Sequence, residues 1–196
     1  MPDVTLDKPK TALLIADFYR DMMTTLPHAI DRKVVENTQA VQKAARDAGI
    51  LVCYSATVFR PGYIEISDRN KTFSQRKASD QPAISDPMLV IHEAVRPIEG
   101  EVVVGKHRVN ALFGTDLDMT LRANNIETII LLGYATSGVV LSTTRYAADA
   151  DYRIIIAEDC CSDSDIEVHD FLTQRIFPRQ ADVVQSDDVI KALAAS

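Results

Sequence analysis

The sequence predicts an α/β fold with a mostly parallel sheet and helices on both of its faces. Two observations along the 196 residues carry this prediction: short apolar runs rich in β-branched residues, and segments of helical spacing that separate those runs. Strands that alternate with helices in this way form βα units. A third observation, the lack of an internal repeat, low-complexity tract or linker, predicts a single domain over residues 1–196.

The first part of the chain supplies two strands and one helix. The apolar run at 11–16 (TALLIA) predicts a buried strand, and residues 18–31 are expected to form a loop because a proline interrupts them. Valines and alanines at helical spacing predict a helix over 33–48, which the following glycine stops. The second strand is expected at 50–54.

The segment 55–97 is the least regular part of the sequence, with recurring prolines and few periodic runs. A long insertion inside a compact domain usually serves as a lid over a site or as a subunit contact. Both interpretations stay open, and the segment is expected to cover either its own site or that of a neighbouring subunit.

Regular alternation returns after residue 100. The expected strands, each a short run rich in β-branched residues, are 101–104, 129–132, 153–157 and 181–184. The expected helices are 115–124, 136–150, 165–176 and 186–196. Thr136 or Ser137 is expected to cap the second of these helices and Ser186 the last. An acidic loop is expected at 158–164.

Charge and cysteine content indicate which binding partners and which cellular compartment to expect. The formal net charge is −7 and no basic block occurs, so neither nucleic acid nor an anionic membrane surface is an expected partner. The three cysteines, Cys53, Cys160 and Cys161, are odd in number and two are adjacent, which indicates a reducing compartment and no disulfide framework. The polar N-terminus lacks the apolar stretch of a signal peptide, and no apolar run reaches membrane-spanning length. A cytoplasmic protein is expected.

Three residues that are far apart in sequence are expected at the same edge of the sheet. Asp17, Lys106 and Val139 each follow a predicted strand, and the carboxyl ends of parallel strands converge on the ligand crevice of an open α/β sheet. A lysine beside the aspartate lowers the pKa of the carboxyl, whereas apolar surroundings raise it. The alternative interpretation is that each charge merely ends a strand and meets water.

The residues around these positions resemble a known family. The segment KHRVNALFGTDL, 106–117, fits loosely the pattern K-x-R-x-x-A-x-F-x-x-T-x-L, and the approach to the lysine, PIEGEVVVGK at 97–106, is also similar to the family's. With G-x-x-T at Gly133–Thr136 and the aspartate after the first strand, the chain resembles the isochorismatase-like hydrolases, a superfamily that includes nicotinamidases and cysteine hydrolases. The resemblance implies a Rossmann-like, three-layer αβα sandwich around a six-stranded sheet, and a homo-oligomer, either dimer or tetramer.

The resemblance also implies roles for particular residues. In the family's cysteine hydrolases an Asp, a Lys and a Cys act on amides, and these positions fall on Asp17, Lys106 and Val139. The oxyanion hole of such enzymes falls on the N–H groups of Val139 and Ala135, with Tyr134-Ala135 as the candidate cis peptide bond. A valine side chain cannot attack a carbonyl, so covalent chemistry at residue 139 is excluded.

Two functions remain open. As in isochorismatases proper, which also lack the cysteine, Asp17 and Lys106 are expected to hydrolyse a small anionic metabolite by acid–base chemistry. The alternative is a catalytically inactive protein of the same fold that binds a small molecule. Cysteine catalysis through Cys160 or Cys161 is a third and more distant interpretation, since free cysteines are usually small buried side chains.

Four further residues are candidates for binding substrate at the rim of the pocket: Tyr19, Arg60, Tyr63 and Arg108. An arginine there binds a substrate carboxylate through two parallel hydrogen bonds, although a solvated or interfacial role is the commoner one. The histidines at 28, 92, 107 and 169 are isolated in sequence, so a structural or surface role is expected for each and no metal site is predicted. No glycine-rich phosphate loop occurs, so no cofactor is expected.

Overall fold

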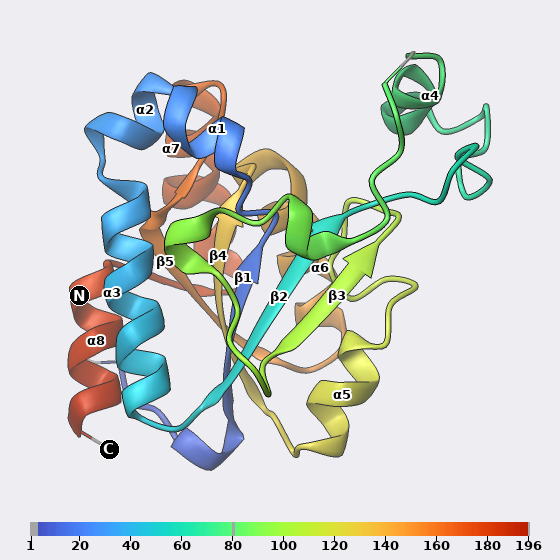
Figure 1. Cartoon of the computed structure of the whole chain (residues 1–196). Helices are drawn as coiled ribbons and strands as arrows, with labels where there is room; N and C mark the ends of the chain where they lie inside the picture. Colours follow the sequence, from blue (N-terminus) through green and yellow to red (C-terminus); the bar gives the residue numbers. More distant parts are fainter. Residues whose placement is uncertain (1–3, 80, 196) are drawn as a thin grey trace.

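The computed structural model describes residues 4–79 and 81–195 and contains a six-stranded, wholly parallel sheet in the order β3-β2-β1-β4-β5-β6 (Figure 1). The strands are β1 Thr11–Ala16, β2 Leu51–Thr57, β3 Val102–Lys106, β4 Thr128–Tyr134, β5 Arg153–Ser162 and β6 Asp182–Val184. The predicted fold class is confirmed. The strand order reverses between β1 and β4, which is where open α/β sheets form a crevice beyond the strand ends.

Helices cover both faces of the sheet. In Figure 1, α3 and α8 lie on one side of it and α5 and α6 on the other, so the architecture has three layers. The α-helices are α1 Arg20–Thr25, α2 Pro27–Asp31, α3 Val34–Asp47, α4 Lys71–Lys77, α5 Leu117–Ala123, α6 Leu141–Asp149, α7 Ile166–Phe171 and α8 Ser186–Ala195. The 3-10 helices are Lys8–Lys10, Pro87–Leu89, Glu93–Val95 and Phe177–Arg179, and π-helical turns occupy Thr136–Val140 and Leu172–Ile176. Within the described residues, no helix is long and apolar enough to cross a membrane.

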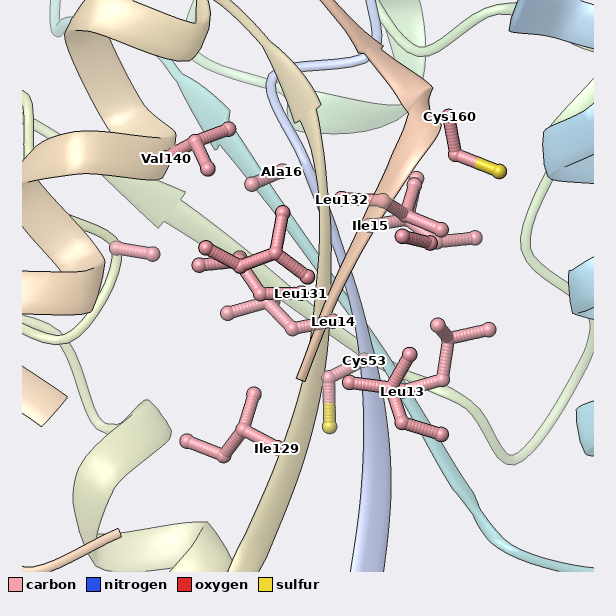
Figure 2. Close-up of a cluster of buried hydrophobic side chains, with 14 of the residues drawn as sticks. Leu13, Leu14, Ile15, Ala16, Cys53, Ile129, Leu131, Leu132, Val140 and Cys160 are labelled. Carbon is pink, nitrogen blue, oxygen red and sulfur yellow. The ribbon is translucent and has the colours of Figure 1, made fainter. Parts of the chain in front are cut away.

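The central strands are buried on both faces because side chains alternate across the sheet. Every residue of β1 is buried. Figure 2 shows Leu14 and Leu131 on the side of Val140, whereas Leu13, Ile15 and Leu132 lie on the side of Cys160. This double burial fixes the register of β1 and β4, and that register places the ends of both strands side by side.

Gly133, near the end of β4, has to be a glycine. It has a φ of +143°, and a Cβ at this position would lie 1.9 Å from the carbonyl oxygen of Ala16 on β1. Side chains other than hydrogen are therefore excluded there by contact with backbone, which cannot move aside. The glycine allows β4 to approach β1 closely just before both strands end.

Two of the predicted irregular regions contain more structure than expected. Residues 18–31 form α1 and α2 rather than a loop; Pro27 begins α2, where its missing N–H needs no partner. The insertion at 55–97 begins with the last residues of β2 and contains α4 and two 3-10 helices. Its outer part projects from the body in Figure 1, and a separate small apolar cluster of Phe59, Tyr63 and Ile66 stabilises it.

The acidic stretch 158–164 was expected to be a loop, but β5 continues through it to Ser162. The strand survives because its pairing with β4 shifts register: Leu131 pairs with Ile156, and Gly133 with Cys161. The shift is a bulge that carries Glu158 out of the regular ladder.

The capping prediction for the helix after β4 is also wrong. Ala135 is the N-cap residue, and neither Thr136 nor Ser137 caps the helix through its side chain. Instead Asp163, from the end of β5, accepts a hydrogen bond from the backbone N–H of Ser137 at 2.7 Å. A carboxylate distant in sequence thus satisfies an N–H group at the start of the helix.

Candidate active site

The ends of β1 and β3 bring a carboxylate and an ammonium group together. Asp17 follows β1 directly, and Lys106 is the last residue of β3. Asp17 Oδ2 lies 2.6 Å from Lys106 Nζ, and the residues are only 6% and 1% exposed. The backbone of Asp17 adopts a φ of +50°, a left-handed conformation that aspartate tolerates better than most residues. Two residues 89 positions apart in sequence therefore form one buried ion pair.

Thr57, at the end of β2 between the two strands, connects the pair to the sheet. Its hydroxyl accepts a hydrogen bond from Lys106 Nζ at 2.6 Å, and its backbone N–H donates to Asp17 Oδ1 at 3.0 Å. Tyr19 completes the arrangement, since its hydroxyl donates to Asp17 Oδ1 at 2.7 Å and accepts from the Thr57 N–H at 2.8 Å. The lysine also donates to the carbonyl oxygen of Arg108 at 3.0 Å.

Burial dominates the electrostatics of this pair. It raises the pKa of Asp17 above the ordinary value, against the opposing effects of Lys106, Tyr19 and Thr57. Burial also lowers the pKa of Lys106, although Asp17 raises it. Both shifts bring the two pKa values closer together, so a proton can reside on the carboxyl at a smaller free-energy cost than in water.

A second feature of the strand ends is the turn after β4. The Tyr134-Ala135 peptide bond is cis, and the π-helical turn Thr136–Val140 begins immediately after it. Because Ala16 pairs with Gly133, this turn lies next to the residue that follows β1, which is Asp17. Val139 is 1% exposed. The turn and the ion pair thus lie at neighbouring strand ends.

The four predicted rim residues divide into two groups. Tyr19 contacts Asp17, and Arg108 contributes a carbonyl oxygen to Lys106. Arg60 instead pairs with Glu65, with Nη1 2.9 Å from Oε1. Tyr63 lies in the small cluster of the insertion and donates its hydroxyl to the carbonyl oxygen of Gln81 at 2.9 Å. No described contact connects Arg60 or Tyr63 with the ion pair.

The cysteines have the environment of core residues. Cys53, Cys160 and Cys161 are all fully buried. Burial raises the pKa of Cys53 and of Cys161 to about 12 and also raises that of Cys160. Since the thiolate is the nucleophile, these thiols are poorly suited to attack a substrate. The structure therefore argues against the cysteine interpretation.

A second polar cluster, partly buried, contacts the turn after β4, and the sequence did not indicate it. His169 on α7 is fully buried between Thr136 Oγ1 and Glu158 Oε1, each 2.8 Å from one ring nitrogen. Glu158 also accepts from Arg32 at 2.6 Å and from Gln185 at 3.0 Å. We call Thr136, His169, Glu158, Arg32 and Gln185 the β5 cluster. A histidine isolated in sequence and a glutamate in an expected loop gave no signal for it.

The described residues contain no group of three or more His, Cys, Asp or Glu side chains that could hold a metal ion. The site consists of the buried Asp17–Lys106 pair and the turn after β4, which contains Ala135 and Val139. Such groups can donate and accept protons and bind an anion.

Comparison with known proteins gives a consistent assignment. Residues 11–188 match the isochorismatase domain. The chain is 28% identical to maleamate amidohydrolase of Pseudomonas putida, over 94% of this chain and 87% of that protein. It is 30% identical to a probable isochorismatase of Pseudomonas chlororaphis, over 95% and 87% of the two chains. An N-carbamoylsarcosine amidase of Arthrobacter is also 30% identical, over 83% of this chain and 62% of that protein.

Solved structures agree in fold. An isochorismatase family protein from Burkholderia thailandensis superposes with a TM-score of 0.82 at 28% identity, over 97% of this chain and 98% of that one. A cysteine hydrolase from Pseudomonas syringae gives a TM-score of 0.88 at 22% identity, over 98% and 96% of the chains, which shows the shared fold. With a domain match over residues 11–188 and named hydrolases among its relatives, the chain belongs to the isochorismatase family of hydrolases.

Proposed function

We propose that this hydrolase acts on a small anionic metabolite through acid–base chemistry of Asp17 and Lys106, without a cysteine nucleophile. The observation that carries the proposal is the buried contact of 2.6 Å between Asp17 Oδ2 and Lys106 Nζ. A general acid has to hold a proton near neutral pH, and the raised pKa of Asp17 favours this state. Lys106 then stabilises the carboxylate after the proton has left.

Val139 selects between the reactions associated with the family. The family resemblance aligns this residue with the nucleophilic cysteine of the amide hydrolases, and an isopropyl group forms no acyl-enzyme. Enol-ether cleavage needs no such nucleophile. Asp17 gives its proton to the vinyl carbon, water adds to the resulting oxocarbenium carbon, and the hemiketal separates into a carbonyl compound and an alcohol. The added water returns a proton to Asp17, which restores the acid.

Arg108 supports an anionic substrate. Its Nη1 donates to the carbonyl oxygens of His107 and Glu65, at 2.6 and 3.1 Å, and these bonds fix the position of the side chain. In the described part of the chain all of its guanidinium hydrogen bonds come from Nη1, which leaves Nε and Nη2 to a ligand. Arginine binds carboxylates through such a pair of donors. The relative from Pseudomonas putida is named for maleamate, which carries a carboxylate.

The rival candidate is a catalytically inactive binding protein of the same fold. Its supporting observation is Val139 itself, a buried hydrocarbon at the position that the family resemblance assigns to the nucleophile. Under this proposal the Asp17–Lys106 pair holds a ligand and does not turn it over.

Asp17→Asn separates the two candidates in a screen of vinyl ethers and small amides. We expect turnover of a vinyl ether by the wild-type protein and a loss of about 10²- to 10⁴-fold in kcat in the variant, with ligand affinity largely kept. Asp159→Asn is the matched control, since that carboxylate accepts from the backbone N–H of Ser186 at another strand end. Arg108→Gln should raise KM more than it lowers kcat. Unchanged turnover in Asp17→Asn contradicts the enzyme proposal, and saturable binding without any product supports the rival.

Val139→Cys tests whether the turn and the ion pair are correctly placed for amide chemistry. We expect a gain of amidase activity, because Asp17 can accept the thiol proton and the N–H groups of Ala135 and Val139 can stabilise the oxyanion. Val140→Cys is the control, since the neighbouring residue is equally buried on the same turn. A folded Val139→Cys protein that modifies no amide counts against the proposed oxyanion hole.

A further inference from the structure

We infer that Thr136, His169 and Glu158 form a chain of hydrogen bonds that positions the turn after β4. The inference rests on the proposed function only for what the turn does, which is to present the N–H groups of Ala135 and Val139 to an anion. The positioning is a property of the folded chain and is measurable without turnover.

The ring of His169 bridges three elements. Its Nδ1 lies 2.8 Å from Thr136 Oγ1 in the turn after β4, and its Nε2 lies 2.8 Å from Glu158 Oε1 in the bulge of β5. The histidine itself belongs to α7 and has no exposed surface. Movement of the turn relative to β5 therefore requires breaking hydrogen bonds that water cannot replace.

The two ends of the ring contact groups that are held in turn by other parts of the chain. The Thr136 hydroxyl also donates to the carbonyl oxygen of Ser162 at 3.0 Å. The opposite nitrogen faces Glu158, whose pKa is lowered to about 2 by His169, Gln185 and Arg32 against the effect of burial. An ionised carboxylate only accepts, so Glu158 is a fixed acceptor for this chain of hydrogen bonds.

The carboxylate of Glu158 connects His169 to further elements. Glu158 lies against the ring from β5, and Arg32 shares the same carboxylate from the end of α2. The ring of His28 on α2 lies 5.0 Å from that of His169 in an edge-to-face arrangement. The histidine is thus held from α2 and β5 on the side opposite the turn.

The hydrogen bonds of Thr136 hold the turn that carries the N–H groups of Ala135 and Val139. Thr136 is bonded directly to Ala135, and the carbonyl oxygen of Ala135 accepts from the N–H groups of Gly138 and Val140 at 3.0 and 3.3 Å. These bonds enclose Val139 between two anchored neighbours. Thr136, His169 and Glu158 touch no substrate in this arrangement, so they are positioning residues and not catalytic ones.

The experiment measures the turn by NMR and needs no turnover, so its result stands whether or not the proposed activity exists. Thr136→Val should shift the backbone amide signals of Ala135 and Val139, and Thr136→Ser, which keeps the hydroxyl, should restore them. Thr173→Val is the matched control, because that buried hydroxyl donates to the carbonyl oxygen of His169 within its own helical segment. If a Thr136 variant without the hydroxyl leaves both amide signals in place, the positioning role is wrong. If Thr136→Val does not fold, His169→Gln compared with Thr173→Val gives the same decision. In an active protein, the variants should lower kcat more than they raise KM.

Discussion

Asp17 at the end of β1 is buried and Glu158 in the bulge of β5 is partly buried. Both carboxylates contact a cation, but their pKa values shift in opposite directions. Burial raises the pKa of Asp17. The pKa of Glu158 is lowered to about 2, although burial opposes this change. The two carboxylates thus differ in chemistry: one is suited to hold a proton and the other is a fixed anion.

The difference lies in the donors around each group. Glu158 accepts from Arg32, His169 and Gln185, and it keeps 14% of its side chain exposed. Asp17 depends on a single cation, Lys106, whose own pKa burial lowers. Arginine stays charged when buried, whereas lysine can release its proton. A buried carboxylate remains an anion when its donors cannot give up their charge, and it becomes a candidate acid when its cation can.

The largest expected effect on stability comes from Glu158→Gln. The change removes the carboxylate that the partly buried Arg32 and the fully buried His169 contact. We expect a loss of about 3 kcal/mol of unfolding free energy, the lower end for breaking a buried pair. Asp17→Asn should cost less, about 1–2 kcal/mol, because Lys106 can become neutral. Urea unfolding of both variants with the wild type measures the difference. Equal losses would show that the two pairs are not distinct in the way described.

Stability against pH should show opposite slopes for the two groups. The pKa of Glu158 is about 2 in the folded chain and 4.5 ordinarily, so its contribution is present above pH 4.5 and is lost as the pH falls toward 2. The linkage amounts to about 3 kcal/mol. The raised pKa of Asp17 has the other sign, since the folded state binds more protons and stability falls as pH rises through that pKa. The unfolding free energy should be measured between pH 2 and 7. In Glu158→Gln its fall at acid pH should disappear, and in Asp17→Asn its decline with rising pH should disappear. If Glu158→Gln loses stability at acid pH as the wild type does, the lowered pKa of Glu158 is contradicted.

The smallest effect is expected from Thr57→Val. The change removes the hydroxyl that accepts from Lys106 Nζ at 2.6 Å, but the ammonium keeps Asp17 and the carbonyl oxygen of Arg108. A loss of about 1 kcal/mol is expected, as for one hydrogen bond. Thermal unfolding measures it, and Thr57→Ser, which keeps the hydroxyl, should remain at the wild-type value. A loss as large as that of Glu158→Gln would place Thr57 among the main supports of the pair.

The prediction from sequence succeeded where local pattern and sheet geometry agree. Asp17 and Lys106 were located because each follows an apolar run, and the ends of parallel strands must lie at one edge. The prediction failed at β5, where a bulge keeps residues 158–162 in the strand despite their acidic composition. It also failed at the start of the helix after β4, because the group that accepts from Ser137 is Asp163 of another element.

The order of apolar runs and helical spacings determined the fold class, because period and length reveal which surfaces must be buried. The same order determined which edge of the sheet carries Asp17, Lys106 and the turn before Val139. Only the tertiary structure decided which charges meet. Whether Glu158 reaches His169, or Lys106 reaches Asp17, depends on strand register and on a bulge, and neither is written in the neighbouring residues. The pKa of each carboxylate depends on these contacts, since it is set by burial and by the donors that other elements supply.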